Sequence, residues 1–99
     1  KERRWEEAAE AYRLGLQHTR DCIVRALLYS NRSLCGAKLR RPLDALQDAN
    51  AAVMLRPGWG KAVGRQAAAL ALLGRYTDAY YCFVRAQCLE PHPDFKRGE

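Results

Sequence analysis

Two cationic side chains, Lys61 and Arg65, lie four residues apart in a stretch whose pattern predicts the start of a helix. Residues at this spacing share one helical face, one turn from each other. Asn31 precedes Arg65 by 34 residues. A guanidinium binds a carboxylate in a fork, an ammonium adds charge, and an amide donates a hydrogen bond. If the two segments lie side by side, these three side chains suit recognition of a carboxylate.

An internal repeat is what brings the two segments together. A shift of 34 residues superimposes Ala45 on Ala79, Ala52 on Ala86, Leu55 on Leu89 and Pro57 on Pro91. A third copy needs a shift of 37 residues, which places Ala8 on Ala45, and the three extra residues fall near the predicted turn at 18–21. Asn31 and Arg65 therefore occupy the same position on two adjacent helices, which pack about 8–10 Å apart.

The period, the small residues at fixed offsets and the proline near the end resemble the tetratricopeptide repeat (TPR) family, over nearly the whole chain. The resemblance implies an all-α helix-turn-helix solenoid whose first helices line a concave groove. In this register the chain is a single domain of about two and a half repeats. Residues 1–20 hold the second helix of a repeat whose first helix is missing, 22–57 and 59–91 are complete repeats, and 92–99 form a tail.

Local patterns predict five helices, at 5–16, 22–39, 42–55, 59–73 and 76–89. Asp21 is an expected N-cap, Pro42 suits a first helical turn, and Gly74 is a C-cap by residue type. Pro91 is expected to end the last helix, on which Tyr80, Phe83 and Ala86 are expected to face inward. Gly36 stands where the family usually has a large residue, so we expect it to admit a neighbour's side chain.

A more specific resemblance involves residues 28–33, Leu-Tyr-Ser-Asn-Arg-Ser, followed by Trp59-Gly60-Lys61 and Arg65. This pattern is similar to the carboxylate-clamp TPR domains of co-chaperones, which bind the acidic C-terminal Glu-Glu-Val-Asp tails of heat-shock proteins 90 and 70. Asn31, Lys61 and Arg65 match three of the family's five clamp residues. The other two, a lysine and an asparagine, belong to the missing first helix. Lys38 lies further along the groove-facing side and adds positive charge.

Other interpretations stay open. Lysine and arginine on an exposed helix face are commonly just solvated, and many TPR domains bind partner proteins without a clamp. The net charge of +6 raises nucleic acid as a partner. The basic residues are scattered, however, rather than aligned with stacking aromatics, so we expect no nucleic-acid binding. His18 and His92 have no carboxylate or nucleophile placed beside them, and no phosphate loop is present. We therefore expect a binding module, with no enzymatic activity and no cofactor.

The same sequence bears on membranes, metals and compartment. No apolar run approaches the length of a membrane span, so we expect no membrane partner. The four cysteines show no C-x-x-C spacing and no paired histidines nearby, which argues against a metal site. Reduced thiols of this kind are typical of intracellular proteins. We expect a cytoplasmic location, with the nucleus as an alternative.

A solenoid normally covers its two ends with polar terminal elements. We expect no such element before the helix at 5–16 or after the helix at 76–89, so both ends of the stack are expected to expose apolar surface. Trp5, Tyr12 and Leu16 are the candidates at one end, and some of Tyr80, Phe83 and Val84 are the candidates at the other. Exposed patches of this kind tend to find partners, which predicts self-association.

Overall fold

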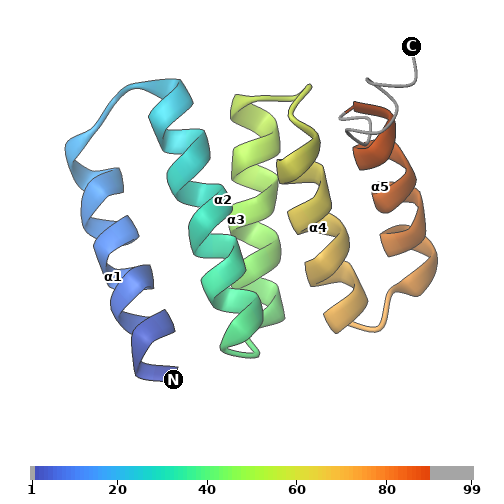
Figure 1. Cartoon of the computed structure of the whole chain (residues 1–99), viewed down its shortest axis with the longest axis horizontal. Coiled ribbons are helices and arrows are strands. Elements are labelled where there is room, and N and C mark those ends of the chain that lie inside the picture. The colour runs from blue at the N-terminus through green and yellow to red at the C-terminus, as the bar shows by residue number, and fades with distance from the viewer. Residues whose placement is uncertain (1, 90–99) are drawn as a thin grey trace, which may run out of the picture.

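A computed structural model describes residues 2–89, and these residues form five α-helices (Figure 1). The helices are α1 Glu2–His18, α2 Cys22–Lys38, α3 Pro42–Leu55, α4 Gly60–Leu72 and α5 Tyr76–Leu89. Each helix packs against the next along the chain, and α2 also packs against α4. The expected all-α repeat is thereby confirmed. Pro91, His92 and the tail at 92–99 lie outside the described residues.

The starts of α2 and α3, the two helices of one repeat, follow from residue type. The carboxylate of Asp21 accepts hydrogen bonds from the backbone N–H groups of Ile23 and Val24, at 2.9 and 3.4 Å, and so caps α2. Pro42 is the first residue of α3, where its missing N–H costs little. Both expectations are confirmed.

The ends of α2 and α4 share one turn geometry. In each, a backbone N–H donates to the carbonyl five residues earlier, from Arg41 at 2.8 Å and from Arg75 at 2.9 Å. The residue before each donor takes the left-handed conformation, Gly74 with φ of 82° and Arg40 with φ of 61°. Glycine adopts this conformation without strain, whereas arginine does not. The two repeats therefore form the same turn, but the backbone is more strained at Arg40 than at Gly74.

Small residues dominate the core, so the helices approach closely. The buried apolar side chains are mostly alanines, and Val63 is the largest side chain among those that are fully buried. A Cβ on Gly36 would lie 3.2 Å from both the backbone nitrogen and the Cβ of Ala45 in α3. Gly36 thus admits both the side chain and the backbone of Ala45, so the expectation that it admits a neighbour's side chain is confirmed, and the close approach of the backbone adds to it.

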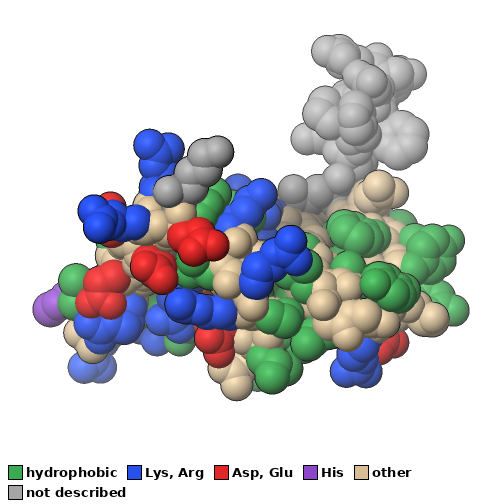
Figure 2. All heavy atoms as spheres, turned by 90° about the horizontal axis from the view of Figure 1, so that it is seen from below, with side chains coloured by type: hydrophobic (Ala, Val, Ile, Leu, Met, Phe, Trp, Pro, Cys, Tyr) green, Lys and Arg blue, Asp and Glu red, His purple; other side chains and the backbone are tan. Residues whose placement is uncertain are grey.

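The two ends of the stack differ in exposure. On α1, the candidates Trp5, Tyr12 and Leu16 are half-buried, and Leu14 is a large apolar side chain that is 42% exposed. On α5, Tyr80 is 64% exposed and Phe83 is 47% exposed. Neither side chain faces inward, because Ala79 is the residue that α5 buries. Figure 2 shows hydrophobic side chains gathered towards the α5 end and charged ones towards the α1 end.

Arg25 fixes α1 to α2. Its guanidinium donates to the backbone carbonyls of Leu16 and Thr19, at 2.8 and 3.0 Å, and so satisfies acceptors at the C-terminal end of α1. None of the helices formed by residues 2–89 is long and apolar enough to cross a membrane.

Candidate functional site

One side of the stack carries the open positions of α2 and α4, and we call it the α2–α4 face. It comprises Ile23, Leu27, Asn31, Leu34 and Lys38 on α2, and Lys61, Gly64, Arg65, Ala68 and Leu72 on α4. These positions recur every three or four residues, so each set forms a stripe on its own helix. A Cβ added to Gly64 would meet nothing within 4 Å, so the surface is open there. The structure therefore places Asn31, Lys61 and Arg65 on adjoining stripes of two packed helices.

The cations of this face carry charge that the described part of the chain does not compensate. Lys61 is exposed, Arg65 is half-buried, and neither forms an ion pair within residues 2–89. The Nε atom of Arg65 is buried and has no hydrogen-bond partner within the same residues. Burial lowers the pKa of the Arg65 guanidinium from its ordinary value. A partly desolvated cation of this kind favours an anionic ligand, because such a ligand restores the lost solvation.

Lys38 lies apart from this pair. Its side chain is exposed, and its Nζ atom lies 5.9 Å from the ring centroid of Trp5 on α1. A cation over an aromatic face gains about 0.5–1 kcal/mol at an exposed site. Lys38 is thus directed towards α1, whereas Asn31 lies on α2 and Lys61 and Arg65 lie on α4, two helices that pack against each other.

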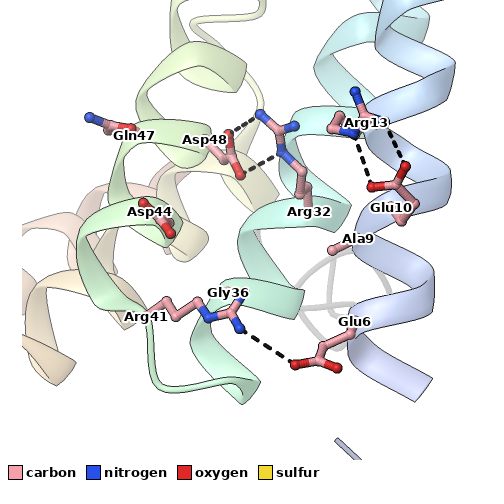
Figure 3. Close-up of a pocket in the computed structure, with 10 residues that line it drawn as sticks. All are labelled: Glu6, Ala9, Glu10, Arg13, Arg32, Gly36, Arg41, Asp44, Gln47 and Asp48. Atoms are coloured by element: carbon pink, nitrogen blue, oxygen red, sulfur yellow. Dashed lines mark hydrogen bonds and ion pairs between the residues drawn. The ribbon is translucent and has the colours of Figure 1, made fainter. Parts of the chain in front are cut away.

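Sequence reasoning missed a second feature, a cleft of about 550 Å³ between α1, α2 and α3 (Figure 3). We call it the α1–α3 cleft, and its lining residues are Glu6, Ala9, Glu10, Arg13, Arg32, Gly36, Arg41, Asp44, Gln47 and Asp48. The available signal was a pair of carboxylates four residues apart on each of two helices, Glu6 with Glu10 and Asp44 with Asp48.

Arginine–carboxylate pairs compensate most of the charge in the α1–α3 cleft. The Arg32 guanidinium donates two hydrogen bonds to Asp48, at 2.9 and 2.8 Å, and these bonds raise the pKa of Arg32. Arg13 pairs with Glu10 at 2.6 Å. A longer contact of 3.5 Å joins Arg41 of the α2–α3 connection to Glu6 of α1.

Asp44 is the one charged lining residue of the α1–α3 cleft without an ion pair among residues 2–89. No group of three or more His, Cys, Asp and Glu side chains in the described part of the chain could hold a metal ion. The cleft is therefore a contact region between helices in which ion pairs compensate most of the charge.

Comparison with known proteins identifies related sequences. The chain is 38% identical over 92 residues to the Hsp70-Hsp90 organizing protein of Triticum aestivum, an alignment that covers 89% of the chain. It is 33% identical over 87 residues to the mouse protein unc-45 homolog B, covering 88% of the chain. It is 43% identical over 65 residues to the human tetratricopeptide repeat protein 28, covering 66%. No family model matches the chain.

The chain spans only a small part of these relatives, 15% of the first, 9% of the second and 3% of the third. The comparison with these relatives therefore applies to the repeat domain and not to a whole protein. The name of the tetratricopeptide repeat protein, the 34-residue period and the five stacked helices agree with one another. The chain is a tetratricopeptide repeat domain, similar to the TPR domains of co-chaperones.

Proposed function

We propose that this domain binds an acidic C-terminal peptide at the α2–α4 face, in an adaptor role without enzymatic activity. The peptide would be of the Glu-Glu-Val-Asp type carried by heat-shock proteins 90 and 70, and the setting would be the cytoplasm or the nucleus. One observation carries the proposal. Within residues 2–89, Lys61 and Arg65 on α4 have no ion-pair partner, and α4 packs against α2, the helix that carries Asn31. The similarity to a protein named Hsp70-Hsp90 organizing protein supports the choice of partner.

Each side chain has a distinct role in this proposal. The Nε of Arg65 is buried, so the two terminal nitrogens of its guanidinium face the ligand and fork onto one carboxylate. Lys61, one turn earlier, contributes a mobile charge, and Asn31 donates from its amide. Lys38 adds to the positive field from beside Trp5. The net charge of +6 speeds the encounter with an acidic peptide at low salt.

The test is a titration of the chain with an acidic peptide that ends in Glu-Glu-Val-Asp, against the same peptide with an amidated C-terminus. Removing the terminal charge should weaken binding roughly tenfold or more, as for a lost charged hydrogen bond. Arg85→Ala provides a matched control, because it removes an exposed cation from α5 and leaves the α2–α4 face intact. Equal affinity for the two peptides would overturn the proposal.

A TPR scaffold that binds a partner protein without a clamp is the alternative. It would bind the two peptides equally or not at all, and Arg65→Ala would have no effect on a partner that binds elsewhere. Binding of an oligonucleotide in place of the peptide would instead favour a nucleic-acid surface, with a steep dependence on salt concentration.

Self-association through the terminal helices stays a prediction, and α5 offers more exposed apolar side chains than α1. Tyr76, Tyr80 and Tyr81 are each more than 60% exposed, and Phe83 and Val84 extend the patch. Sedimentation over a concentration series should show a dimer that Tyr80→Glu abolishes. A monomer at every concentration would contradict the prediction.

A further inference from the structure

Two buried polar atoms near the proposed clamp have no hydrogen-bond partner among the described residues. They are Oγ of Ser30 on α2 and Nε of Arg65 on α4. Ser30 is fully buried, with 0% of its surface exposed. Buried polar groups in native proteins are nearly always paired, so an unpaired hydroxyl and an unpaired N–H call for an explanation.

Neighbouring residues show which way Ser30 faces. The hydroxyl of Ser33 donates to the carbonyl of Ala45, which marks the side of α2 that faces α3. Leu28 lies 3.2 Å from the Cβ position of Gly15, which marks the side that faces α1. At about 100° per residue, Ser30 lies about 60° from Ser33 and about 160° from Leu28. It therefore faces away from α1, towards α4, the remaining helix that packs on α2.

Arg65 lies on α4, the other helix of this contact. Gln66 donates to Asn50 at 2.8 Å, which marks the side of α4 that faces α3. Arg65 lies one residue earlier, so its side chain is turned by about 100° from the α3 side of the helix, and it is half-buried there. Helices α2 and α4 pack against each other, and the chemistry of the two unpaired atoms is complementary. The Nε–H is a donor, and a serine oxygen is an acceptor.

We propose that Ser30 is a positioning residue for Arg65, a role that rests on the proposed peptide binding. When a carboxylate binds the terminal nitrogens of Arg65, the Nε–H donates to Oγ of Ser30. The Ser30 hydroxyl can then donate to the backbone carbonyl four residues earlier, as serine commonly does within helices. Both buried groups are satisfied in the complex, and the guanidinium plane is fixed towards the ligand. Ser30 thereby strengthens carboxylate recognition without touching the peptide.

The measured quantity is the discrimination ratio, the Kd for the amidated acidic peptide divided by the Kd for the free-carboxylate peptide. Ser30→Ala should reduce this ratio roughly fivefold to tenfold, because Arg65 loses its fixed orientation. The variant should fold at least as stably as the parent chain, because it removes an unpaired buried hydroxyl. Ser30→Cys keeps the shape of the side chain, with a slightly larger atom that is only a weak acceptor, and should behave in the same way.

Ser33→Ala is the matched control. It removes another buried serine hydroxyl from the same helix, one that is bonded to Ala45 at 2.8 Å. It should lower the midpoint of urea unfolding and leave the discrimination ratio unchanged. A ratio that falls equally in Ser33→Ala and Ser30→Ala would overturn the proposal, because a general loss of packing would then explain both.

A double-mutant cycle with Arg65→Lys separates positioning from packing. Lysine has no equivalent of the Nε–H, so Ser30→Ala should cause no further loss of discrimination in that background. Additive losses would overturn the role of Ser30. If the parent chain does not discriminate between the peptides, the proposed function fails together with this inference. If the parent discriminates and Ser30→Ala retains the full ratio, only the inference fails.

Discussion

The α1–α3 cleft and the α2–α4 face lie on different sides of α2 and handle charge in opposite ways. In the cleft, three guanidiniums meet three carboxylates, and the best-buried pair, Arg32 with Asp48, is bidentate. On the face, Lys61 and Arg65 have no carboxylate partner among residues 2–89. The cleft contains more charged residues and a cavity of about 550 Å³, yet most of its charges already satisfy one another.

This difference distinguishes charged side chains that hold helices together from charged side chains that are available to bind a ligand. A paired arginine in a partly dry contact holds helices together, and an external anion must displace a carboxylate to reach it. An unpaired, partly desolvated arginine makes the fold less stable and a complex more favourable. Cavity size alone would have directed attention to the α1–α3 cleft, whereas charge compensation directs it to the α2–α4 face.

The largest expected effect is on stability, at the cleft. Asp48→Asn removes the charge of a carboxylate that is only 11% exposed and leaves the Arg32 guanidinium unpaired. The free energy of unfolding should fall by about 2–3 kcal/mol, the usual cost of losing a hydrogen bond to a charged group. Urea unfolding measures it, as a lower midpoint with an unchanged slope. Peptide affinity of the folded variant should not change, and a neutral effect on stability would remove the structural role of this pair.

Arg65→Ala is the mirror change on the α2–α4 face. Affinity for the acidic peptide should fall by about 1.5–3 kcal/mol, while the urea midpoint stays level or rises, because an unpaired buried Nε is removed. Calorimetric titration and urea unfolding of the same sample measure the two quantities. A large loss of stability with intact binding would reverse the comparison between the two regions.

How far the sequence predicts this molecule depends on how local each feature is. The five helices, the Asp21 cap and the Gly74 turn were all predictable, because repeat period and capping chemistry act over a few residues. The shared stripes of Asn31, Lys61 and Arg65 follow from the same register. The 34-residue shift also relates Arg40 to Gly74, a signal that was present and missed.

The misses concern relations between helices. That Gly36 admits the backbone of Ala45 in addition to its side chain depends on how closely α2 and α3 approach. The exposure of Tyr80 and Phe83 depends on which face of α5 meets α4, and small residues such as Ala79 decide it. The α1–α3 cleft and the unpaired Ser30 hydroxyl depend on three-dimensional spacing that no local pattern encodes.

A smaller effect is expected at Arg40, next to the cleft arginine Arg41, and it separates backbone strain from charge. Arg40→Gly should stabilise the chain by about 0.5–1 kcal/mol, because glycine adopts φ near 61° without strain. Arg40→Ala removes the same charge but retains a Cβ, so it should show no such gain. Thermal unfolding of the two variants measures the difference. Equal gains would mean that charge, and not backbone conformation, limits this turn.

The smallest effect is expected at the exposed end of the α1–α3 cleft, and it tests whether burial or pairing makes a charge structural. A hydrogen bond from Arg13 lowers the pKa of the Glu10 carboxyl, although both side chains are about half exposed. Because the folded-state pKa of Glu10 is the lower one, the pair makes its full contribution to stability above the ordinary pKa of glutamate, and this contribution is lost as pH falls through the folded-state pKa.

Arg13→Gln should return the Glu10 pKa to its ordinary range, as followed by carboxyl NMR, without moving the urea midpoint at neutral pH. Solvent screening makes exposed pairs nearly neutral for stability, so Asp48 and Glu10 should differ although both accept two bonds from an arginine. If Arg13→Gln lowered the urea midpoint as much as Asp48→Asn, an exposed ion pair would stabilise the fold as much as a buried one, and burial would not matter.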